Sequence, residues 1–198
     1  MGGQCQLVEV EEGAMYGRID IDQAHSPANT KGEIMSHAAA LPIALDRGAG
    51  DARWFLGALA TIKASGETTG GGVSVTEFWA PRGHGSPLHV HRNEDEWFYV
   101  LSGELTFWID GTVTTATAGS FVYGPRDVPH TFAVSSEEAQ FLVVTEPAGF
   151  ENFLLELSQP AQSRTLPPAS VEPPALETLV ATAANYGLEI LGPPGIPT

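Results

Sequence analysis

The sequence predicts an all-β protein, built as a sandwich or barrel of many short strands. From about Trp54 onward, runs rich in β-branched and aromatic residues are separated by glycine and proline turns at regular spacing. An Asp110-Gly111 dipeptide lies between two such runs and is a strong signal for a tight hairpin. Short strands at regular spacing are typical of sandwiches and barrels. The predicted strands are 54–56, 58–63, 73–80, 104–110, 112–117, 119–123, 131–134 and 140–145.

The first candidate functional residues lie between Gly83 and Gly103, in the run GHGSPLHVHRNEDEWFYVLSG. His89 and His91 are two residues apart, so on a strand their imidazoles point to the same face. The polar stretch 92–95 suits a turn, and the apolar stretch 97–101 is expected to return as a second strand. Such a hairpin brings a carboxylate back beside the two imidazoles. Alternation alone does not choose among the carboxylates available, which are Glu94, Asp95 and Glu96.

A further histidine lies downstream in the run GSFVYGPRDVPHTF, residues 119–132. His130 begins another short apolar strand, and a glycine and two prolines before it indicate a turn. Imidazole nitrogens and carboxylate oxygens together are ligands for a borderline divalent metal such as Fe, Mn, Ni, Co, Cu or Zn. The pattern therefore predicts one divalent transition metal per chain.

These two runs together resemble the paired motifs of the cupin superfamily. The first motif matches in full, through Gly83, His89, His91, Glu96 and Gly103. The second matches at His130, but Asp127 stands where the family usually has glycine and Val134 where it often has asparagine. Aspartate tolerates left-handed backbone better than most residues, so we expect the turn to be kept.

The resemblance implies a double-stranded β-helix, the jelly-roll barrel of the cupins. It also implies that the metal lies inside the barrel, with positions left open for substrate or dioxygen. The family spacing to Gly103 selects Glu96 over the two rival carboxylates. The implied ligands are His89, His91, Glu96 and His130.

The tail YGLEILGPPG, residues 186–195, is similar to the C-termini of single-cupin proteins described as quercetin 2,3-dioxygenase-like. This resemblance implies a metal-dependent dioxygenase that cleaves an enolisable aromatic small molecule, with Glu96 accepting the substrate's hydroxyl proton. Two alternatives stay open because fold and ligands are shared across the superfamily. One is a non-redox metal cupin (an isomerase, decarboxylase or lyase), and the other is a cupin that binds a small molecule without turnover.

Aromatic residues on the strands are expected to line an apolar pocket around the metal. The candidates are Phe78 or Trp79, Trp97, Tyr99, Phe107 or Trp108, Tyr123, Phe132 and Phe141. Loop residues beside the ligands are candidate substrate contacts, namely Arg82, His84, Ser86 and Arg126. Glu77 lies in an otherwise apolar strand and is a candidate pocket acid or partner of a metal ligand.

The composition limits the classes of partner. The chain has 198 residues, a formal net charge of −15 and a pI near 4.6. An acidic surface repels phosphate backbones and anionic lipids, so we expect neither nucleic acid nor a membrane as partner. The expected partners are a small-molecule substrate and, for oxidative chemistry, dioxygen. The single cysteine, Cys5, excludes an intramolecular disulfide, and the lack of an apolar leader predicts a cytoplasmic protein.

The chain divides into three predicted segments. Residues 1–34 lack periodic apolar residues and are expected to form a poorly ordered extension. Residues 35–158 are expected to form the barrel, and residues 159–198 a proline-rich connector, a helix and the tail. Short helices are predicted over 149–158 and from Pro174 up to Gly187. Strand edges and apolar strand faces that need covering predict a homodimer.

Overall fold

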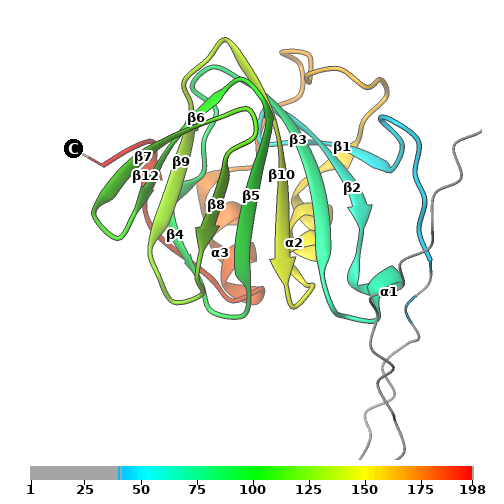
Figure 1. Ribbon diagram of the computed structural model, residues 1–198, viewed down its shortest axis with the longest axis horizontal. Helices are drawn as coiled ribbons and strands as arrows, with labels where there is room; N and C mark the ends of the chain where they lie inside the picture. The colour runs from blue at the N-terminus through cyan, green and yellow to red at the C-terminus, as the bar shows by residue number, and fades with distance from the viewer. Residues whose placement is uncertain (1–39, 41, 198) are drawn as a thin grey trace, which may run out of the picture. The chain divides into compact units, whose positions relative to one another are not determined.

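Two antiparallel sheets form the fold of the computed structural model, which describes residue 40 and residues 42–197 (Figure 1). The large sheet has the order β11 (Gln159–Pro160), β1 (Asp51–Phe55), β2 (Ala58–Ala64), β3 (Ser74–Pro81), β10 (Glu138–Glu146), β5 (Asp95–Ser102) and β8 (Phe121–Gly124). The small sheet has the order β12 (Leu188–Pro194), β4 (Pro87–His91), β9 (His130–Val134), β6 (Glu104–Ile109) and β7 (Thr112–Thr117). Buried side chains from both sheets form one hydrophobic core. This is the double-stranded β-helix that the resemblance to the cupins implies.

The alternating pattern within a strand decides which side chains enter this core. In β3, the side chains of Ser74, Thr76, Phe78 and Ala80 are buried, and the residues between them are half exposed. The same alternation buries Phe98 and Val100 of β5 between the sheets. The predicted extension over residues 1–34 lies outside the described residues.

Two tight hairpins have residues in left-handed backbone. The predicted Asp110-Gly111 turn is confirmed between β6 and β7, with φ angles of 45° and 84°. Leu56 and Gly57 form a similar turn between β1 and β2, with φ angles of 49° and 89°. Both pairs suit the two-residue hairpin in which both central residues have positive φ. Leu56 was predicted to end a strand, but it is a turn residue.

The predicted hairpin between the two histidines and Glu96 is wrong. β4 pairs with β12 and β9, whereas β5 pairs with β10 and β8 in the other sheet. The turn after β4 is anchored to the tail, since the Arg92 N–H donates to the Gly187 carbonyl oxygen at 2.8 Å. The tail then forms β12 and takes the place beside β4, a strand that the sequence analysis did not foresee.

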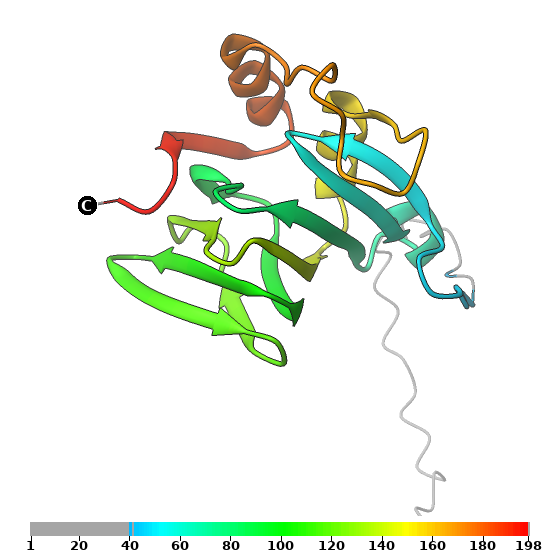
Figure 2. The same cartoon turned by 90° about the horizontal axis from the view of Figure 1, so that it is seen from above.

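Helices cover one side of the two sheets (Figure 2). The helix predicted over 149–158 is confirmed as α2 (Phe150–Leu157), which packs against β1 and β3. The second predicted helix is α3 (Leu176–Asn185), which begins two residues after Pro174 and contacts α2 and β12. A single turn, α1 (Gly66–Thr69), follows β2. None of the helices in residues 42–197 is long and apolar enough to cross a membrane.

A buried carboxylate fixes the start of α2. Glu151 is only 2% exposed, and its Oε1 accepts a hydrogen bond from the Gly66 N–H at 2.7 Å. Its Oε2 accepts one from the Gly149 N–H at 2.8 Å. One side chain therefore joins the turn after β2 to the first turn of α2.

We expect Glu151→Ala to lower the free energy of unfolding by about 2–4 kcal/mol, because two backbone N–H groups lose their acceptor. Glu151→Gln is expected to cost less, since the amide oxygen still accepts one of the two bonds. Urea denaturation of both variants measures the difference. Equal stability of Glu151→Ala and the unmodified chain would contradict this role.

Candidate metal centre

The small sheet supplies three histidines on its inner face. His89 and His91 lie on β4, and His130 is the first residue of β9, directly opposite His89 in the strand register. The turn before His130 is tied to β4, because the Asp127 N–H donates to the His91 carbonyl oxygen at 2.8 Å. Asp127 has a φ angle of 63°, so the aspartate keeps the left-handed turn, as expected.

The large sheet supplies the carboxylate from the facing side. Glu96 is the second residue of β5 and pairs with Gly124 of β8 and Thr145 of β10. Its side chain is 4% exposed and points inward, toward the histidines. The four residues therefore meet because two sheets face each other, and not because one hairpin folds back.

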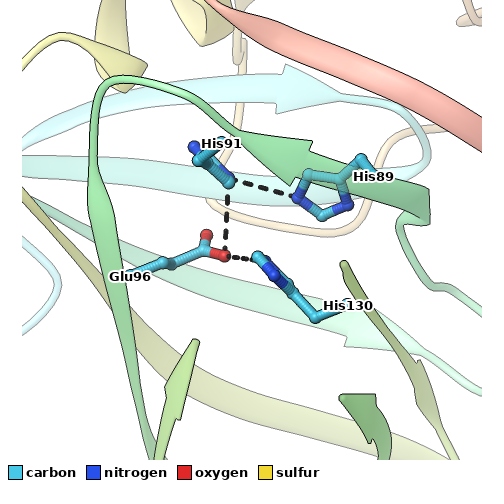
Figure 3. A group of neighbouring side chains, drawn as sticks. All are labelled: His89, His91, Glu96 and His130. Carbon is cyan, nitrogen blue, oxygen red and sulfur yellow. Dashed lines mark hydrogen bonds and ion pairs between the residues drawn. The ribbon is translucent and has the colours of Figure 1, made fainter. Parts of the chain in front are cut away.

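The four side chains converge on one point inside the barrel (Figure 3). Their ligand atoms all lie within 4.8 Å of one another. His89 Nε2 is 3.1 Å from His91 Nε2, and Glu96 Oε2 is 2.9 Å from His130 Nε2 and 3.6 Å from His91 Nε2. All four residues are buried. The structure thus brings together the residues that the sequence singles out.

The other ring nitrogen of each histidine faces an acceptor. His89 Nδ1 lies 2.8 Å from the Pro87 carbonyl oxygen. His130 Nδ1 lies 2.9 Å from the Val128 carbonyl oxygen. A carbonyl oxygen only accepts, so Nδ1 carries a hydrogen in both rings, and each ring in its neutral form points its Nε2 lone pair into the cluster.

Facing lone pairs make this cluster a good fit for a cation. With hydrogen on Nδ1, the Nε2 lone pairs of His89 and His91 face each other at 3.1 Å, which is repulsive without a positive charge nearby. Three imidazole nitrogens and one carboxylate oxygen are a donor set for a first-row divalent metal. Hydrogen bonds to Nδ1 orient such ligands in metalloproteins.

The protonation of Glu96 and of His89 also suits metal binding. Burial raises the pKa of Glu96, but the neighbouring His91 and a hydrogen bond with His130 outweigh it and bring the pKa to about 2. Burial lowers the pKa of His89 to about 3, with repulsion from His130 and His91 adding to it. At neutral pH, Glu96 is therefore ionised and His89 neutral, the forms in which both bind metals.

Glu94 has a role that the sequence analysis did not assign. It was a rival carboxylate for the cluster, but its Oε2 lies 3.2 Å from His91 Nδ1, on the far side of that ring. Glu94 is 2% exposed, so this contact is buried. A carboxylate behind a metal-binding histidine orients the ring and raises its basicity. The third rival, Asp95, forms an ion pair with Arg126 instead.

We expect Glu94→Ala to weaken metal binding about 10–100-fold, because His91 loses the group that orients its ring. Glu94→Gln should retain most of the affinity, since the amide oxygen still accepts from Nδ1. Competition titration with a chelating dye measures both constants. Similar losses in the two variants would contradict an orienting role based on the hydrogen bond.

A mostly apolar cavity opens beside the cluster, and His89 and Glu96 form part of its wall. About 70 Å³ of the cavity admits the centre of a water-sized sphere. The space that it offers a ligand is therefore small. Its aromatic lining consists of Phe55, Phe78, Phe132, Phe150 and Phe153.

The predicted aromatic lining is partly wrong. Phe78 and Phe132 line the cavity, and Phe107 and Phe141 lie in the core. Trp97 and Tyr99 of β5 lie on the outer face of the large sheet, because their neighbours Glu96 and Phe98 point inward. Tyr123 of β8 pairs with Trp97, and the two rings stack 5.5 Å apart on that face. Two phenylalanines of α2 take their place in the lining.

The candidate loop contacts also divide into two groups. His84 and Ser86 line the cavity. Arg82 instead donates to the Ser135 carbonyl oxygen, and Arg126 pairs with Asp95. Glu77 is neither a pocket acid nor a partner of a ligand, because it forms an ion pair with Lys63 on the outer face.

Known proteins match this part of the chain. The cupin domain family matches residues 76–145, which include all four residues of the cluster. The quercetin 2,3-dioxygenase of Bacillus subtilis (strain 168) is 28% identical over 168 residues, covering 84% of this chain and 49% of that protein. The quercetin 2,3-dioxygenase of Aspergillus japonicus is 32% identical over 85 residues, covering 40% of this chain and 24% of that protein. The matched part of the chain thus spans about half or less of the length of these relatives.

Among solved structures, an RmlC-like cupin from Shewanella frigidimarina NCIMB 400 is 18% identical, with a TM-score of 0.49. That likeness covers 57% of this chain and 96% of the other. The family match falls on the facing sheets and the buried cluster described above. Topology, cluster and family match agree that residues 76–145 form a cupin domain.

Proposed function

We propose that this cupin is a metal-dependent dioxygenase that cleaves an enolisable aromatic small molecule such as a flavonol. One observation supports the proposal most strongly: the buried cluster of three histidines and Glu96 lies beside a cavity with a phenylalanine lining. A divalent metal held by His89, His91, Glu96 and His130 would supply a Lewis acid and, if redox-active, oxygen chemistry. The two curated relatives, both quercetin 2,3-dioxygenases, agree with this choice.

Glu96 is the proposed proton acceptor. Its pKa of about 2 keeps it a carboxylate at neutral pH, and it forms part of the cavity wall. A hydroxyl next to a carbonyl loses its proton on enolisation, and a carboxylate within reach can accept it. Glu96 Oε2 stays oriented through its contact with His130 at 2.9 Å.

The phenylalanines have the second proposed role, which is to exclude water and hold a flat ring. Phe132 packs edge-on against Phe141 and Phe98 in the core, so its position in the cavity wall is fixed. The ring centroid of Phe150, the first residue of α2, lies 5.5 Å from the ring centroid of His91. An apolar wall raises the strength of electrostatic interactions within the site.

The test is incubation of the protein with quercetin, with and without dioxygen, after loading with Fe, Mn, Co, Ni or Cu. We expect oxygen-dependent loss of the flavonol absorbance with at least one metal, accompanied by stoichiometric oxygen consumption. Flavonol loss that proceeds equally without dioxygen would contradict a dioxygenase. No loss with any of the five metals would also reject it.

A second candidate, a non-redox cupin acting on a smaller substrate, is favoured by the small volume of the cavity. Only about 70 Å³ of the cavity admits the centre of a water-sized sphere, so a small substrate fits with less rearrangement than a flavonol does. An isomerase, decarboxylase or lyase would use the same four residues to hold the metal as an electrophile. Turnover of a small keto acid without oxygen consumption would select this candidate.

We also propose that the chain forms a homodimer through an outer aromatic face. This face consists of Trp97, Tyr99, Leu101, Phe121 and Tyr123, on β5 and the edge strand β8. Phe121 is 62% exposed, and exposed apolar patches of this kind are typical of interaction sites. Self-association covers both the apolar face and the open strand edge.

The double variant Tyr99→Lys with Phe121→Lys is expected to be monomeric, because the two lysines of each chain would place four like charges in a symmetric contact. Light scattering at micromolar concentration measures the mass. Thr114→Lys, an exposed position on the other edge strand β7, serves as the control and should remain dimeric. A monomeric unmodified chain would reject the proposal.

A further inference from the structure

Two glycines hold His84 at the cavity wall. The segment 83–85 leads toward β4, with Gly83 at a φ angle of 79°, which favours glycine. A Cβ at Gly85 would overlap the carbonyl oxygen of Phe132, so glycine is also required there. The His84 N–H donates to the Pro81 carbonyl oxygen at 3.0 Å, and its carbonyl accepts from the Val134 N–H at 2.8 Å. The backbone of His84 is therefore fixed on both sides.

His84 is the polar side chain of the cavity that remains for a ligand. Among the described residues that line the cavity, the polar ones are His84, Ser86, His89 and Glu96. His89 and Glu96 belong to the metal cluster. The Ser86 hydroxyl lies 3.3 Å from the Thr131 hydroxyl and 3.4 Å from the Phe132 N–H, so β9 engages it. A ligand that fills the cavity meets the metal cluster and His84.

The environment of His84 makes its ring neutral. Burial lowers the pKa of His84 to about 4, although a hydrogen bond with the Leu56 backbone opposes the shift. Leu56 lies in the left-handed turn between β1 and β2 and also lines the cavity. A backbone carbonyl takes the single N–H of a neutral imidazole, so the other ring nitrogen is an acceptor.

We infer that His84 determines specificity by accepting a hydrogen bond from a hydroxyl group of a neutral aromatic substrate. This inference rests on the proposed function and adds a second polar contact to it, apart from the metal. A substrate carboxylate at this position would face a lone pair instead of a donor, in an apolar cavity where an unpaired charge is costly. Neutral polyhydroxylated rings are therefore preferred over ring systems without hydroxyls and over aromatic acids.

Two flavonols test the inference by binding alone. Quercetin and 3-hydroxyflavone share the hydroxyl-ketone group that a metal binds, but 3-hydroxyflavone lacks the other four hydroxyls. We expect the metal-loaded, oxygen-free protein to bind quercetin about 10-fold more tightly, the value of one buried hydrogen bond. Titration followed by tryptophan fluorescence gives both dissociation constants.

The variants separate hydrogen bonding from simple space filling. His84→Leu should reduce the quercetin preference to about one, with little effect on 3-hydroxyflavone. His84→Asn keeps an acceptor and should retain part of the preference, and Ser86→Ala should retain it fully. Metal content and circular dichroism verify that each variant is folded and loaded.

The outcomes also separate this inference from the proposed function. Binding with the expected preference, but without oxygen-dependent turnover, would reject the dioxygenase and support the role of His84. An unchanged preference in His84→Leu would overturn the role of His84, even with an active dioxygenase. Equal affinities for the two flavonols in the unmodified protein, or no binding of either, would overturn it as well.

Discussion

The His91→Ala variant is expected to lose its metal, from about one ion per chain to a small fraction of that. His91 contributes one of the four convergent ligand atoms, and its removal also leaves Glu94 buried without its partner. A protein that binds metal only when folded gains about 4 kcal/mol of stability at a metal concentration 1,000 times the Kd. The unmodified chain should therefore melt at higher temperature when metal is added, and the variant should not.

Elemental analysis of purified protein measures the metal content directly. His84→Asn is the matched control, because this histidine lines the same cavity but lies outside the cluster, and it should keep a full complement of metal. Acidification should release metal from the unmodified chain, because protons compete for the three imidazole nitrogens. Full retention of metal by His91→Ala would contradict the assignment of the ligands.

The Glu96→Gln variant is expected to lose flavonol turnover by a factor of about 10²–10⁴, the usual contribution of a general base. Glutamine has nearly the same shape, but its amide does not accept the substrate proton. The loss should appear mainly in kcat, because proton acceptance stabilises the transition state more than it does the bound substrate. This effect would separate the base from a residue that only binds.

The turnover of Glu96→Gln and of the unmodified protein is compared at equal metal content. A lower metal content of the variant is then not mistaken for the loss of the base. Glu77→Gln removes a carboxylate from the outer face of the same sheet and should keep full activity. If Glu96→Gln at equal metal loading turns over flavonol as fast as the unmodified protein, Glu96 is not the base.

Local sequence determined which residue types could form the site. The His-X-His spacing puts the imidazoles of His89 and His91 on one face of a strand. The turn of glycine and proline residues before His130 allows this third histidine to begin a strand. The Asp110-Gly111 turn and the short apolar runs were likewise sufficient to predict an all-β fold. These features depend on period two and on turn chemistry, which act over a few residues.

The same periodicity contained one further signal. If Glu96 points inward, then Phe98 and Val100 do so too, and Trp97 and Tyr99 lie outside. The choice of Glu96 as a ligand therefore contradicted the choice of Trp97 and Tyr99 as pocket residues. The structure follows the carboxylate, with the aromatic pair on the outer face.

Only the tertiary structure decided which strands are neighbours. β4 and β5 are joined by a short turn, yet they belong to different sheets, and β4 pairs with β12 from the far end of the chain. The same long-range packing puts Glu94 behind His91 and brings two phenylalanines of α2 to the cavity. Spacing along a chain fixes the face of a strand to which a side chain points. The partner across that face depends on which sheet buries the strand, and residues far away in the sequence decide that.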